Sequence, residues 1–326
     1  MTFNEFLEEW RGQGDIITVK TSGSTGSPKT MILKKEFVRS SGRRTNSFFS
    51  LDSSSRLHSC VSADFIGGKM MAVRSELAGC RFTWETPSNR PLSGVEKGES
   101  IDLLAVVPSQ MVHILDHLDE MPPLGAIIIG GSAIHPDLKR RIAASGLNAF
   151  ETYGMTETAS HIALSKITGD ETRFTPLNGI RVATDERGCL VILFDSGEMV
   201  VTNDIAEIIE GAGVEEDSVE DGYDKDGREV SFRILGRIDN VIVTGGKKVN
   251  PEDLERRIAG LIDADFMITS RPDEKWGERV VLRVASPAIS ADLLTRLRGV
   301  LEPHEMPKEI EYVSSLPLTP NGKLKR

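Results

Sequence analysis

The sequence predicts an α/β protein: a layered N-terminal domain built on a parallel sheet, with a β-rich end, and a small α+β C-terminal domain. Short apolar runs alternate with helical patterns up to about residue 155. Short β segments with turns follow from about 175 to 210, and a compact unit begins after Gly236. Alternating strands and helices are typical of parallel α/β layers. We expect domains at residues 1–236 and 237–326.

The N-terminal domain is expected to begin with an amphipathic acidic helix at residues 1–10, then a strand at Asp15–Lys20 and a helix from Lys34 to about Phe49. Apolar runs predict five further strands: Leu57–Ser62, Arg81–Trp84, Leu103–Val107, Ala126–Ile129 and Asn148–Thr152. Helical patterns between them predict three helices: Gly68–Ala78, Ser109–Leu118 and Pro136–Ser145. Ligands of such sheets gather at the carboxyl ends of the strands.

The second half predicts β structure and then a mixed unit. Cys189–Phe194 reads as a strand, and the acidic stretch Gly211–Glu229 as a solvated hairpin or loop, because its carboxylates show no fixed ligand spacing. Four strands are expected after Gly236: Val241–Thr244, Ala264–Thr269, Arg279–Ala285 and Glu309–Val313. Two helices are expected there, Pro251–Ala259 opened by Asn250 and Ser290–Leu301 capped by Ser290.

Composition narrows the class of protein. With 39 basic and 49 acidic residues the formal net charge is −10, which disfavours general binding to nucleic acid or anionic membranes. No apolar run is long enough to span a bilayer, and the acidic N-terminus does not resemble a signal peptide. Cys60, Cys80 and Cys189 lack C-x-x-C spacing, as expected of idle thiols in a reducing cytosol. We expect a cytoplasmic protein without membrane insertion.

The stretch Thr21–Lys29 (TSGSTGSPK) combines glycines, hydroxyls and one lysine. Such a loop offers close backbone N–H groups, extra donors and a mobile cation, which suit a polyphosphate. A flexible Ser/Gly-rich loop is the alternative interpretation. The stretch is not a P-loop, because it contains no Gly-Lys-[Ser/Thr].

Four further motifs follow: Glu151–Thr158, Val201–Glu207, Gly236–Glu255 and Leu316–Arg326. In the first, Tyr153 offers a face for a base, and Glu157 offers the hard oxygen that suits Mg²⁺ carried by phosphates. In the second, Asp204 ends a strand and could accept hydrogen bonds from ribose hydroxyls. The alternatives are a surface glutamate and an ordinary turn aspartate.

Together and in this order, the five motifs resemble those of the adenylate-forming enzymes, the acyl-CoA synthetases and their relatives, over almost the whole chain. The resemblance implies that a carboxylic acid attacks the α-phosphate of ATP, giving an acyl-adenylate and pyrophosphate. The thiol of coenzyme A then displaces AMP. The expected small molecules are therefore ATP with Mg²⁺, coenzyme A and a carboxylic acid.

The resemblance also implies roles for individual residues. The β- and γ-phosphates of ATP would be held by Thr21, Ser22, Ser24, Thr25 and Lys29, and the nucleotide-binding set would also include Gly23 and Gly26 of the same loop. The adenine would be surrounded by Gly130, Gly131, Ser132 and Tyr153, with Gly154 in the same nucleotide-binding set, and Thr156 would contact the α-phosphate. Glu157 would hold Mg²⁺, and the ribose would be bound by Asp204 and Arg237. Lys323 resembles the adenylation lysine, a compact cation that bridges the carboxylate and the α-phosphate.

The C-terminal domain is expected to be mobile, because Asp239 matches the hinge position of these enzymes. One pose would deliver Lys323 and the other the 243–248 hairpin. There Gly245 and Gly246 would leave room for the pantetheine arm, and Lys247 or Lys248 would meet coenzyme A phosphates.

Details such as Gly236–Asn240 and Val107–Gln110 (VPSQ) resemble one branch, the o-succinylbenzoate–CoA ligases of menaquinone synthesis. That substrate carries a second carboxylate, for which Lys69 or Arg74 is a candidate partner, with Ser109 nearby. A solvated helix face is the alternative interpretation of both cations.

The sequence also departs from these enzymes. The phosphate loop begins at residue 21, where a substantial subdomain usually precedes it, so we expect either a trimmed architecture or a homo-oligomer that covers the exposed side of the sheet. Residues 62–65 (SADF) stand where these enzymes often place a histidine or aromatic residue near the acyl pocket, and Asn203 stands where a glycine usually precedes the ribose aspartate. Alternative functions are another aryl- or acyl-CoA ligase, a carrier-protein-loading enzyme, and a non-catalytic nucleotide-binding remnant.

Overall fold

The computed structural model describes residues 1–20, 30–96, 98–209, 219–220, 223–224, 230–290 and 292–317. Contacts between Cα atoms divide the chain into two units. Unit 1 comprises Met1–Val182, Leu193–Val200 and Ile209–Phe232. Unit 2 comprises Ala183–Ile192, Val201–Ile208 and Arg233–Arg326. The domain boundary expected between residues 236 and 237 stays a prediction.

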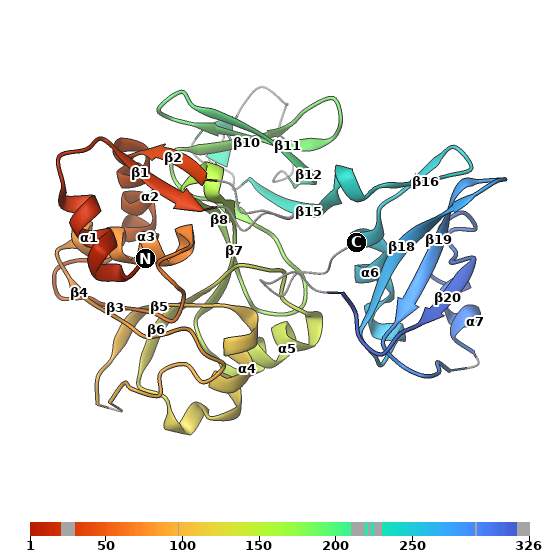
Figure 1. Cartoon of the computed structure of the whole chain (residues 1–326), viewed down its shortest axis with the longest axis horizontal. Helices are drawn as coiled ribbons and strands as arrows, with labels where there is room; N and C mark the ends of the chain where they lie inside the picture. The colour runs from red at the N-terminus through yellow and green to blue at the C-terminus, as the bar shows by residue number, and fades with distance from the viewer. Residues whose placement is uncertain are drawn as a thin grey trace. The chain divides into compact units, whose positions relative to one another are not determined.

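Unit 1 is organised around a seven-stranded sheet in the order β4-β3-β5-β6-β7-β8-β9 (Figure 1). Strands β4 to β7 are parallel, whereas β8 and β9 run antiparallel to their neighbours. The strands are β3 (Arg56–Ser59), β4 (Arg81–Trp84), β5 (Ile101–Val106), β6 (Leu124–Ile129), β7 (Ala149–Met155), β8 (Ser160–Lys166) and β9 (Thr175–Pro176). The predicted α/β class with a parallel sheet is confirmed.

Helices cover both faces of this sheet (Figure 1). They are α3 (Ile66–Ala78), α4 (Pro108–Asp116), η1 (Leu118–Glu120) and α5 (Pro136–Ser145). Met111 and Ile114 of α4 and Ile142 of α5 share a core with residues of β5 and β6. On the other face, Met70 and Val73 of α3 join a second core. The sheet is therefore buried on both sides, as its apolar strands require.

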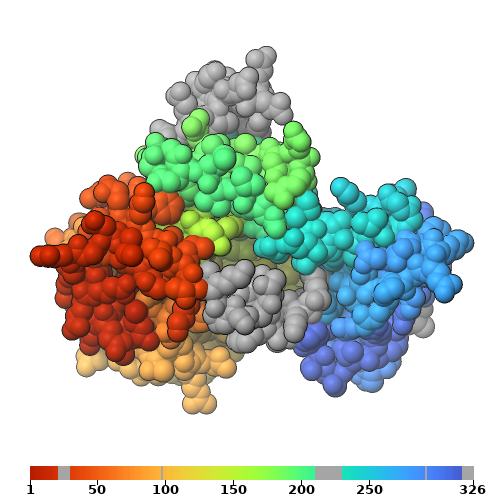
Figure 2. Space-filling model, turned by 45° about the horizontal axis from the view of Figure 1, so that its top comes forward, coloured from red at the N-terminus to blue at the C-terminus, as the bar shows by residue number. Residues whose placement is uncertain are grey.

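The N-terminal segment contributes to that second core. It consists of α1 (Phe3–Arg11), the antiparallel hairpin β1 (Ile16–Lys20) and β2 (Thr30–Lys34), and α2 (Lys35–Phe48). The aromatic residues Phe3, Phe6 and Trp10 are the buried side of amphipathic α1. In Figure 2 these red and orange segments form one continuous surface.

The β-rich end is a four-stranded sheet in the order β10-β11-β12-β15, with segments in each unit. Its strands are β10 (Ile180–Thr184), β11 (Cys189–Phe194), β12 (Met199–Ile209) and β15 (Ser231–Arg237). Within the acidic stretch, β13 (Val219–Glu220) and β14 (Tyr223–Asp224) pair as an antiparallel hairpin. For these four residues, the pairing agrees with the hairpin that the sequence predicts as one possibility for this stretch.

The C-terminal part contains a five-stranded sheet, in which β20 pairs in parallel with β19 beside the order β17-β16-β19-β18. The strands are β16 (Ile242–Thr244), β17 (Lys247–Val249), β18 (Phe266–Asp273), β19 (Gly277–Val284) and β20 (Glu309–Tyr312). The helices are η3 (Ile238–Asn240), α6 (Pro251–Ile258), η4 (Ala259–Leu261) and α7 (Leu293–Arg298). Buried Leu254, Ile258 and Leu297 attach α6 and α7 to the sheet.

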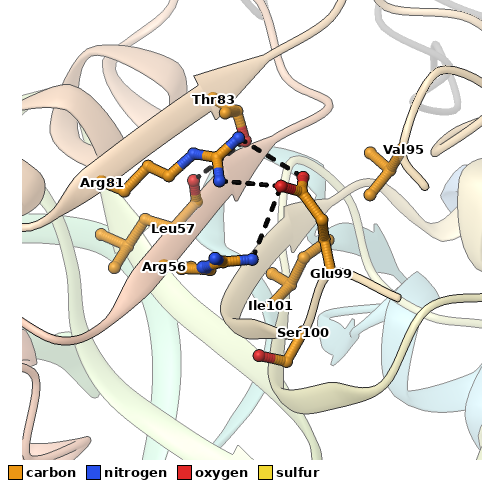
Figure 3. Close-up of a pocket in the computed structure, with 8 residues that line it drawn as sticks. All are labelled: Arg56, Leu57, Arg81, Thr83, Val95, Glu99, Ser100 and Ile101. Carbon is orange, nitrogen blue, oxygen red and sulfur yellow. Dashed lines mark hydrogen bonds and ion pairs between the residues drawn. The ribbon is translucent and has the colours of Figure 1, made fainter. Parts of the chain in front are cut away.

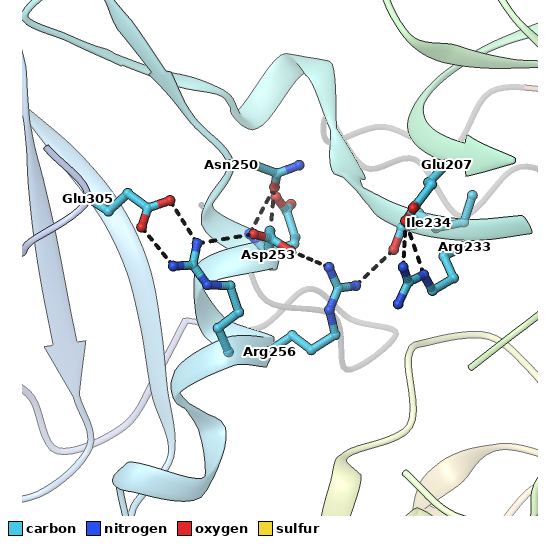
Figure 4. Close-up of polar contacts among 9 residues, drawn as sticks. Glu207, Arg233, Ile234, Asn250, Asp253, Arg256 and Glu305 are labelled. Carbon is cyan, nitrogen blue, oxygen red and sulfur yellow. Dashed lines mark hydrogen bonds and ion pairs between the residues drawn. The ribbon is translucent and has the colours of Figure 1, made fainter. Parts of the chain in front are cut away.

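Charged side chains fix α6 within unit 2 (Figure 4). Arg256 pairs with Asp253 one turn earlier and donates to the carbonyl of Ile234, 3.1 Å away. The neighbouring Arg257 pairs with Glu305 at 2.8 Å. These contacts tie the helix to β15 and to the segment before β20.

Two expectations need correction. The helix expected at Ser290–Leu301 is shorter, Leu293–Arg298, and its N-cap position is Asp292 rather than Ser290. Neither residue makes the capping hydrogen bond from its side chain, because the Ser290 hydroxyl donates to the Asp292 carboxylate instead. Second, no strand is predicted at β2, β8 or β15; the run of β8, Ser160–Lys166, mixes polar and apolar residues. No helix among the described residues is long and apolar enough to cross a membrane.

The Asn250 cap of α6 provides a test of local stability. Its side chain accepts hydrogen bonds from the backbone N–H groups of Glu252 and Asp253. Asn250→Ala should destabilise α6 by about 1 kcal/mol, which speeds amide exchange at Leu254–Ile258 about fivefold. Ser290→Ala is the matched control and should leave exchange in α7 unchanged. Equal effects of the two substitutions would contradict this assignment.

Candidate functional site

The glycine turn after β6 lies at the carboxyl end of a parallel strand, as expected. An added Cβ at Gly130 would lie 2.6 Å from Thr152 Oγ1, and Gly131 has φ +92°, so both positions require glycine. A buried ion pair supports the turn: Lys139 Nζ lies 2.6 Å from Glu151 Oε2. The half-buried Ser132 therefore follows a fixed backbone.

The motif Glu151–Thr158 forms the end of β7 and the 3₁₀ turn η2 (Thr156–Thr158). The chain then reverses into β8, and the two strands approach closely at Gly154. A Cβ there would lie 2.2 Å from the Ser160 carbonyl oxygen, so only glycine allows this reversal. The exposed Glu157 and the half-buried Thr156 are presented at its tip.

Buried hydroxyl groups stabilise the strained backbone at this tip. Ala159 and Ser160 have φ +51° and +86°, a conformation that costs of order 1–3 kcal/mol per residue outside glycine. The Thr158 hydroxyl accepts from Met155 N–H at 2.9 Å and lies 2.6 Å from the Ser160 carbonyl. Ser41 on α2 donates to the Ala159 carbonyl at 2.8 Å. Sequence reasoning missed Ser41, because its partner lies 118 positions along the chain.

Tyr153 lies in an aromatic cluster. Its ring centroid is 5.6 Å from that of Phe174 and 5.3 Å from that of Phe232, the latter edge-on. The half-buried ring is thereby held in one orientation. Its contact with adenine stays a prediction.

The two candidate acid-binding cations of α3, Lys69 and Arg74, are buried, with exposed fractions of 2% and 1%. The alternative interpretation, that both lie on a solvated helix face, is therefore wrong. Lys69 Nζ lies 2.7 Å from Met1 Sδ and 4.4 Å from the centroid of the Phe6 ring. Burial lowers the pKa of Lys69. Lys69 therefore faces the aromatic residues of α1.

Arg74 faces β8 instead. Its Nη2 lies 3.5 Å from Ser160 Oγ and 3.4 Å from His161 Nδ1, and its Nε has no hydrogen-bond partner. In the described part of the chain no carboxylate is paired with it. Burial lowers the pKa of Arg74 to about 9. A buried guanidinium without an anion is costly, which is unusual for a purely structural residue.

His161 orients that guanidinium. Burial, and then the charge of Arg74, hold the pKa of His161 well below its usual range, so its imidazole is neutral. Because an arginine only donates, Nδ1 is the acceptor and Nε2 carries the proton. Nε2 then donates to Thr45 Oγ1 at 2.9 Å. His161 is a second positioning residue that sequence reasoning missed.

Ser109 is exposed on the first turn of α4. Its neighbour Gln110 is buried, accepts from Val107 N–H at 3.0 Å and donates to the Cys60 carbonyl at 2.9 Å. The Val107–Gln110 motif is thus tied to the end of β3.

The predicted ribose and hinge residues meet within unit 2. Arg237 pairs with Asp204 at 3.2 Å and with Asp239 at 2.8 Å. Asn203 donates to both oxygens of Asp239 at 3.2 Å. These hydrogen bonds, that of Arg237 first, lower the pKa of Asp239. Arg187, which sequence reasoning missed, donates to Asn203 Oδ1 at 3.2 Å.

The expected CoA-binding hairpin is formed by β16 and β17. Gly245 and Gly246 have φ +57° and +78°, which matches the two-residue turn that suits hairpins. A Cβ at Gly245 would lie 2.8 Å from the Trp276 ring, so the indole lies directly against the turn. Lys247 and Lys248 are exposed. Trp276, 41% exposed, is a further candidate that the sequence alone did not indicate.

Several predicted residues lie outside the described residues. They are Thr21, Ser22, Gly23, Ser24, Thr25, Gly26 and Lys29 of the phosphate loop, and Lys323.

A hollow at the other end of the sheet is structural (Figure 3). Glu99 pairs there with Arg81 at 2.8 Å and with Arg56 at 3.6 Å. Arg56 and Arg81 begin β3 and β4, so this cluster lies at the amino ends of the strands. Ligands of parallel sheets bind at the carboxyl ends.

Comparison with known families identifies the class. The model of the AMP-binding enzyme family matches residues 14–206, more than half of the chain, and that of the AMP-binding enzyme C-terminal domain matches residues 264–323. The chain therefore belongs to the AMP-binding enzyme family, which confirms the predicted resemblance.

Individual proteins of this family are similar to the chain in sequence. The 2-succinylbenzoate–CoA ligase of Lactococcus lactis subsp. lactis (strain IL1403) is 26% identical over 246 residues, covering 73% of this chain and 53% of the ligase. This chain thus spans about half of that ligase. The enzyme of the same name from Enterococcus faecalis (strain ATCC 700802 / V583) is 22% identical, covering 93% and 67%. The probable non-canonical nonribosomal peptide synthetase CymA of Salinispora arenicola (strain CNS-205) is 27% identical, covering 94% and 4%.

Solved structures agree. An acyl-CoA synthetase (AMP-forming)/AMP-acid ligase II-like protein from Dyadobacter fermentans DSM 18053 is 30% identical with a TM-score of 0.62, covering 99% of this chain and 91% of that one. MenE, the o-succinylbenzoate CoA synthetase of Bacillus subtilis, solved with ATP and magnesium ion, is 18% identical with a TM-score of 0.73, covering 95% and 68%. The latter likeness concerns the fold alone.

The strained η2 turn gives a testable prediction. Ser41→Ala should leave the buried Ala159 carbonyl without its donor, costing about 1–3 kcal/mol in the free energy of unfolding. It should also weaken the binding of ATP with Mg²⁺, measured by calorimetry, because η2 carries Thr156 and Glu157.

The matched control is Ser75→Ala. Ser75 is equally buried and donates to the Ala72 carbonyl inside α3. Its loss should cost stability without changing nucleotide affinity. If the two substitutions weaken nucleotide binding equally, Ser41 has no positioning role.

Proposed function

We propose that this chain is an ATP-dependent acid–CoA ligase whose substrate is an aromatic dicarboxylic acid, o-succinylbenzoate or a close analogue. Membership of the AMP-binding enzyme family supports the reaction type. The names of the Lactococcus and Enterococcus relatives support the substrate. The observation that carries the proposal is the buried guanidinium of Arg74, which has no anionic partner among the described residues.

The reaction joins two displacements. An oxygen of the substrate carboxylate attacks the α-phosphorus of ATP, and pyrophosphate leaves. The sulfur of coenzyme A then attacks the acyl carbon, and AMP leaves as the thiol loses its proton. The first step brings two anions together, so positive charge aimed at the forming bond is its main requirement.

Arg74 would bind the second carboxylate of such an acid. Its Nε is buried and has no hydrogen-bond partner, and Nη2 makes only long contacts, at 3.4 and 3.5 Å. The N–H groups of Nε and Nη2 can therefore still donate to both oxygens of one carboxylate. A carboxylate would supply the charge that burial otherwise leaves uncompensated. His161, whose Nε2 donates to Thr45 Oγ1, positions the guanidinium through the contact of its Nδ1 with Arg74 Nη2. Of the two predicted cations, these surroundings favour Arg74, since Lys69 faces Phe6 and Met1.

The remaining roles follow the family resemblance. Glu157 would hold Mg²⁺, whose charge neutralises the phosphates; its exposed carboxylate on a fixed turn suits a hard cation. Asp204 and Arg237 would bind the ribose, and Asp239 would act as the hinge. Thr21–Lys29 would hold the terminal phosphates, and Lys323 would bridge the reacting carboxylate and the α-phosphate.

A second candidate function is the loading of an acid onto a carrier protein's pantetheine thiol. It is favoured by the Salinispora relative, a probable nonribosomal peptide synthetase that covers 94% of this chain. AMP release that depends on a carrier protein rather than on coenzyme A would select it.

The role of Arg74 is tested by Arg74→Met, which keeps an unbranched side chain and removes the charge. The kcat/KM for o-succinylbenzoate, measured by AMP release, should fall about 10- to 100-fold because a charged hydrogen-bonded contact is lost. The kcat/KM for 4-oxo-4-phenylbutanoate, which lacks the benzoate carboxylate, should change less than about threefold, since that acid makes no contact there.

Lys69→Met is the matched control, because it removes the other buried cation of α3. It should not alter the ratio between the two acids. A wild-type protein that releases AMP with neither acid would refute the substrate class, and an unchanged ratio in Arg74→Met would refute only the role of Arg74.

A further inference from the structure

Three side chains of the types that bind metal ions lie together outside the predicted site, at the carboxyl ends of β3 and β4. His58 is on β3, Cys60 follows that strand directly, and Glu85 follows β4. Their ligand atoms all lie within 4.8 Å of one another. His58 is 3% exposed, Cys60 is fully buried, and the Glu85 side chain is 17% exposed.

The tautomer of His58 directs a lone pair into this cluster. Thr83 Oγ1 lies 2.8 Å from His58 Nδ1 and 3.4 Å from the Leu57 carbonyl oxygen. The hydroxyl donates to the carbonyl, so it accepts the proton of Nδ1. Nε2 is then the unprotonated nitrogen, and it is buried without a hydrogen-bond partner. An imidazole whose other nitrogen is bonded in this way is the usual arrangement of a metal ligand.

Glu85 presents a carboxylate to that nitrogen. Its Oε2 lies 3.8 Å from His58 Nε2, too far for a hydrogen bond. The backbone N–H of Leu92 donates to both oxygens of Glu85 at 3.0 and 3.1 Å, which fixes the carboxylate. Leu92 adopts φ +66°, so the loop that covers the cluster is held in a strained conformation.

The spacing suits a tetrahedral ion. Zinc bonds of roughly 2.0 Å to nitrogen or oxygen and 2.3 Å to sulfur place neighbouring donors about 3.3–3.8 Å apart. The 3.8 Å between Nε2 and Oε2 is already close to that spacing. Nitrogen, sulfur and oxygen donors together favour zinc over the all-oxygen ions Mg²⁺ and Ca²⁺.

We propose that His58, Cys60 and Glu85 form a zinc site with a solvent-derived fourth ligand. Zinc binding releases the Cys60 thiol proton and gives a Zn–S bond, with no change of oxidation state. The ion would tie the ends of β3 and β4 to the loop at Leu92. Since Gln110 donates to the Cys60 carbonyl, it would also support the first turn of α4.

The experiment titrates Co²⁺ into the full chain after chelator treatment. One Co²⁺ per chain should produce the sulfur-to-cobalt charge-transfer band, and Zn²⁺ should displace it. Cys60→Ser should abolish the band, whereas Cys80→Ser and Cys189→Ser, which change the other two thiols, should retain it.

If Cys60→Ser does not fold, Thr83→Val provides a second test of the metal site. It keeps all three ligands and the side-chain shape, and should weaken Co²⁺ binding about 10- to 100-fold through the loss of the bond to His58 Nδ1. Absence of the band in the wild type, or its persistence in Cys60→Ser, would overturn the proposal. Absence of the band would mean that the three side chains bind no such ion, and its persistence in Cys60→Ser would assign the sulfur ligand to Cys80 or Cys189.

Discussion

The close approach of β7 and β8 at Gly154 is the constraint on which the candidate site depends. It ends the parallel part of the sheet and forces the chain to reverse through η2, which presents Thr156 and Glu157. The same reversal brings Ser160 and His161 against Arg74 of α3. Two non-glycine residues accept a left-handed backbone there, and Ser41 and Thr158 hold them. One turn therefore supports both the proposed nucleotide contacts and the proposed acid-binding cation.

Burial of Arg74 without a paired carboxylate connects this geometry to function. Removing a guanidinium from water costs several kcal/mol unless an anion compensates it. The described residues supply only a neutral imidazole, a hydroxyl and a thioether within reach. A protein can retain such an arrangement when the missing charge arrives with its substrate. The neutral His161 matters here, because it accepts a hydrogen bond from Arg74 without supplying the negative charge.

Much of the fold could be predicted from the sequence, and the site only in part. Local signals sufficed for Pro136–Ser145 and Arg81–Trp84, where periodicity and caps determine the element. Strand β8 escaped prediction because its run lacks a clear period and its pairing depends on a glycine contact visible only in three dimensions. Sequence motifs predicted that Arg74, Asp204 and Arg237 are ligand-binding residues, from their residue types and positions. Their burial and partners, and the positioning residues Ser41 and His161, depend on contacts between distant segments that no local pattern encodes.

The most direct test of the account observes the Arg74 guanidinium itself. In a protein labelled with ¹⁵N-arginine, the Nε–H resonance missing from Arg74→Met identifies the group. Saturating o-succinylbenzoate should shift that resonance, and 4-oxo-4-phenylbutanoate should leave it in place, because only the first acid carries the carboxylate that Arg74 is proposed to bind. An Nε–H resonance that does not respond to o-succinylbenzoate, while the acid is shown to bind, would contradict the account.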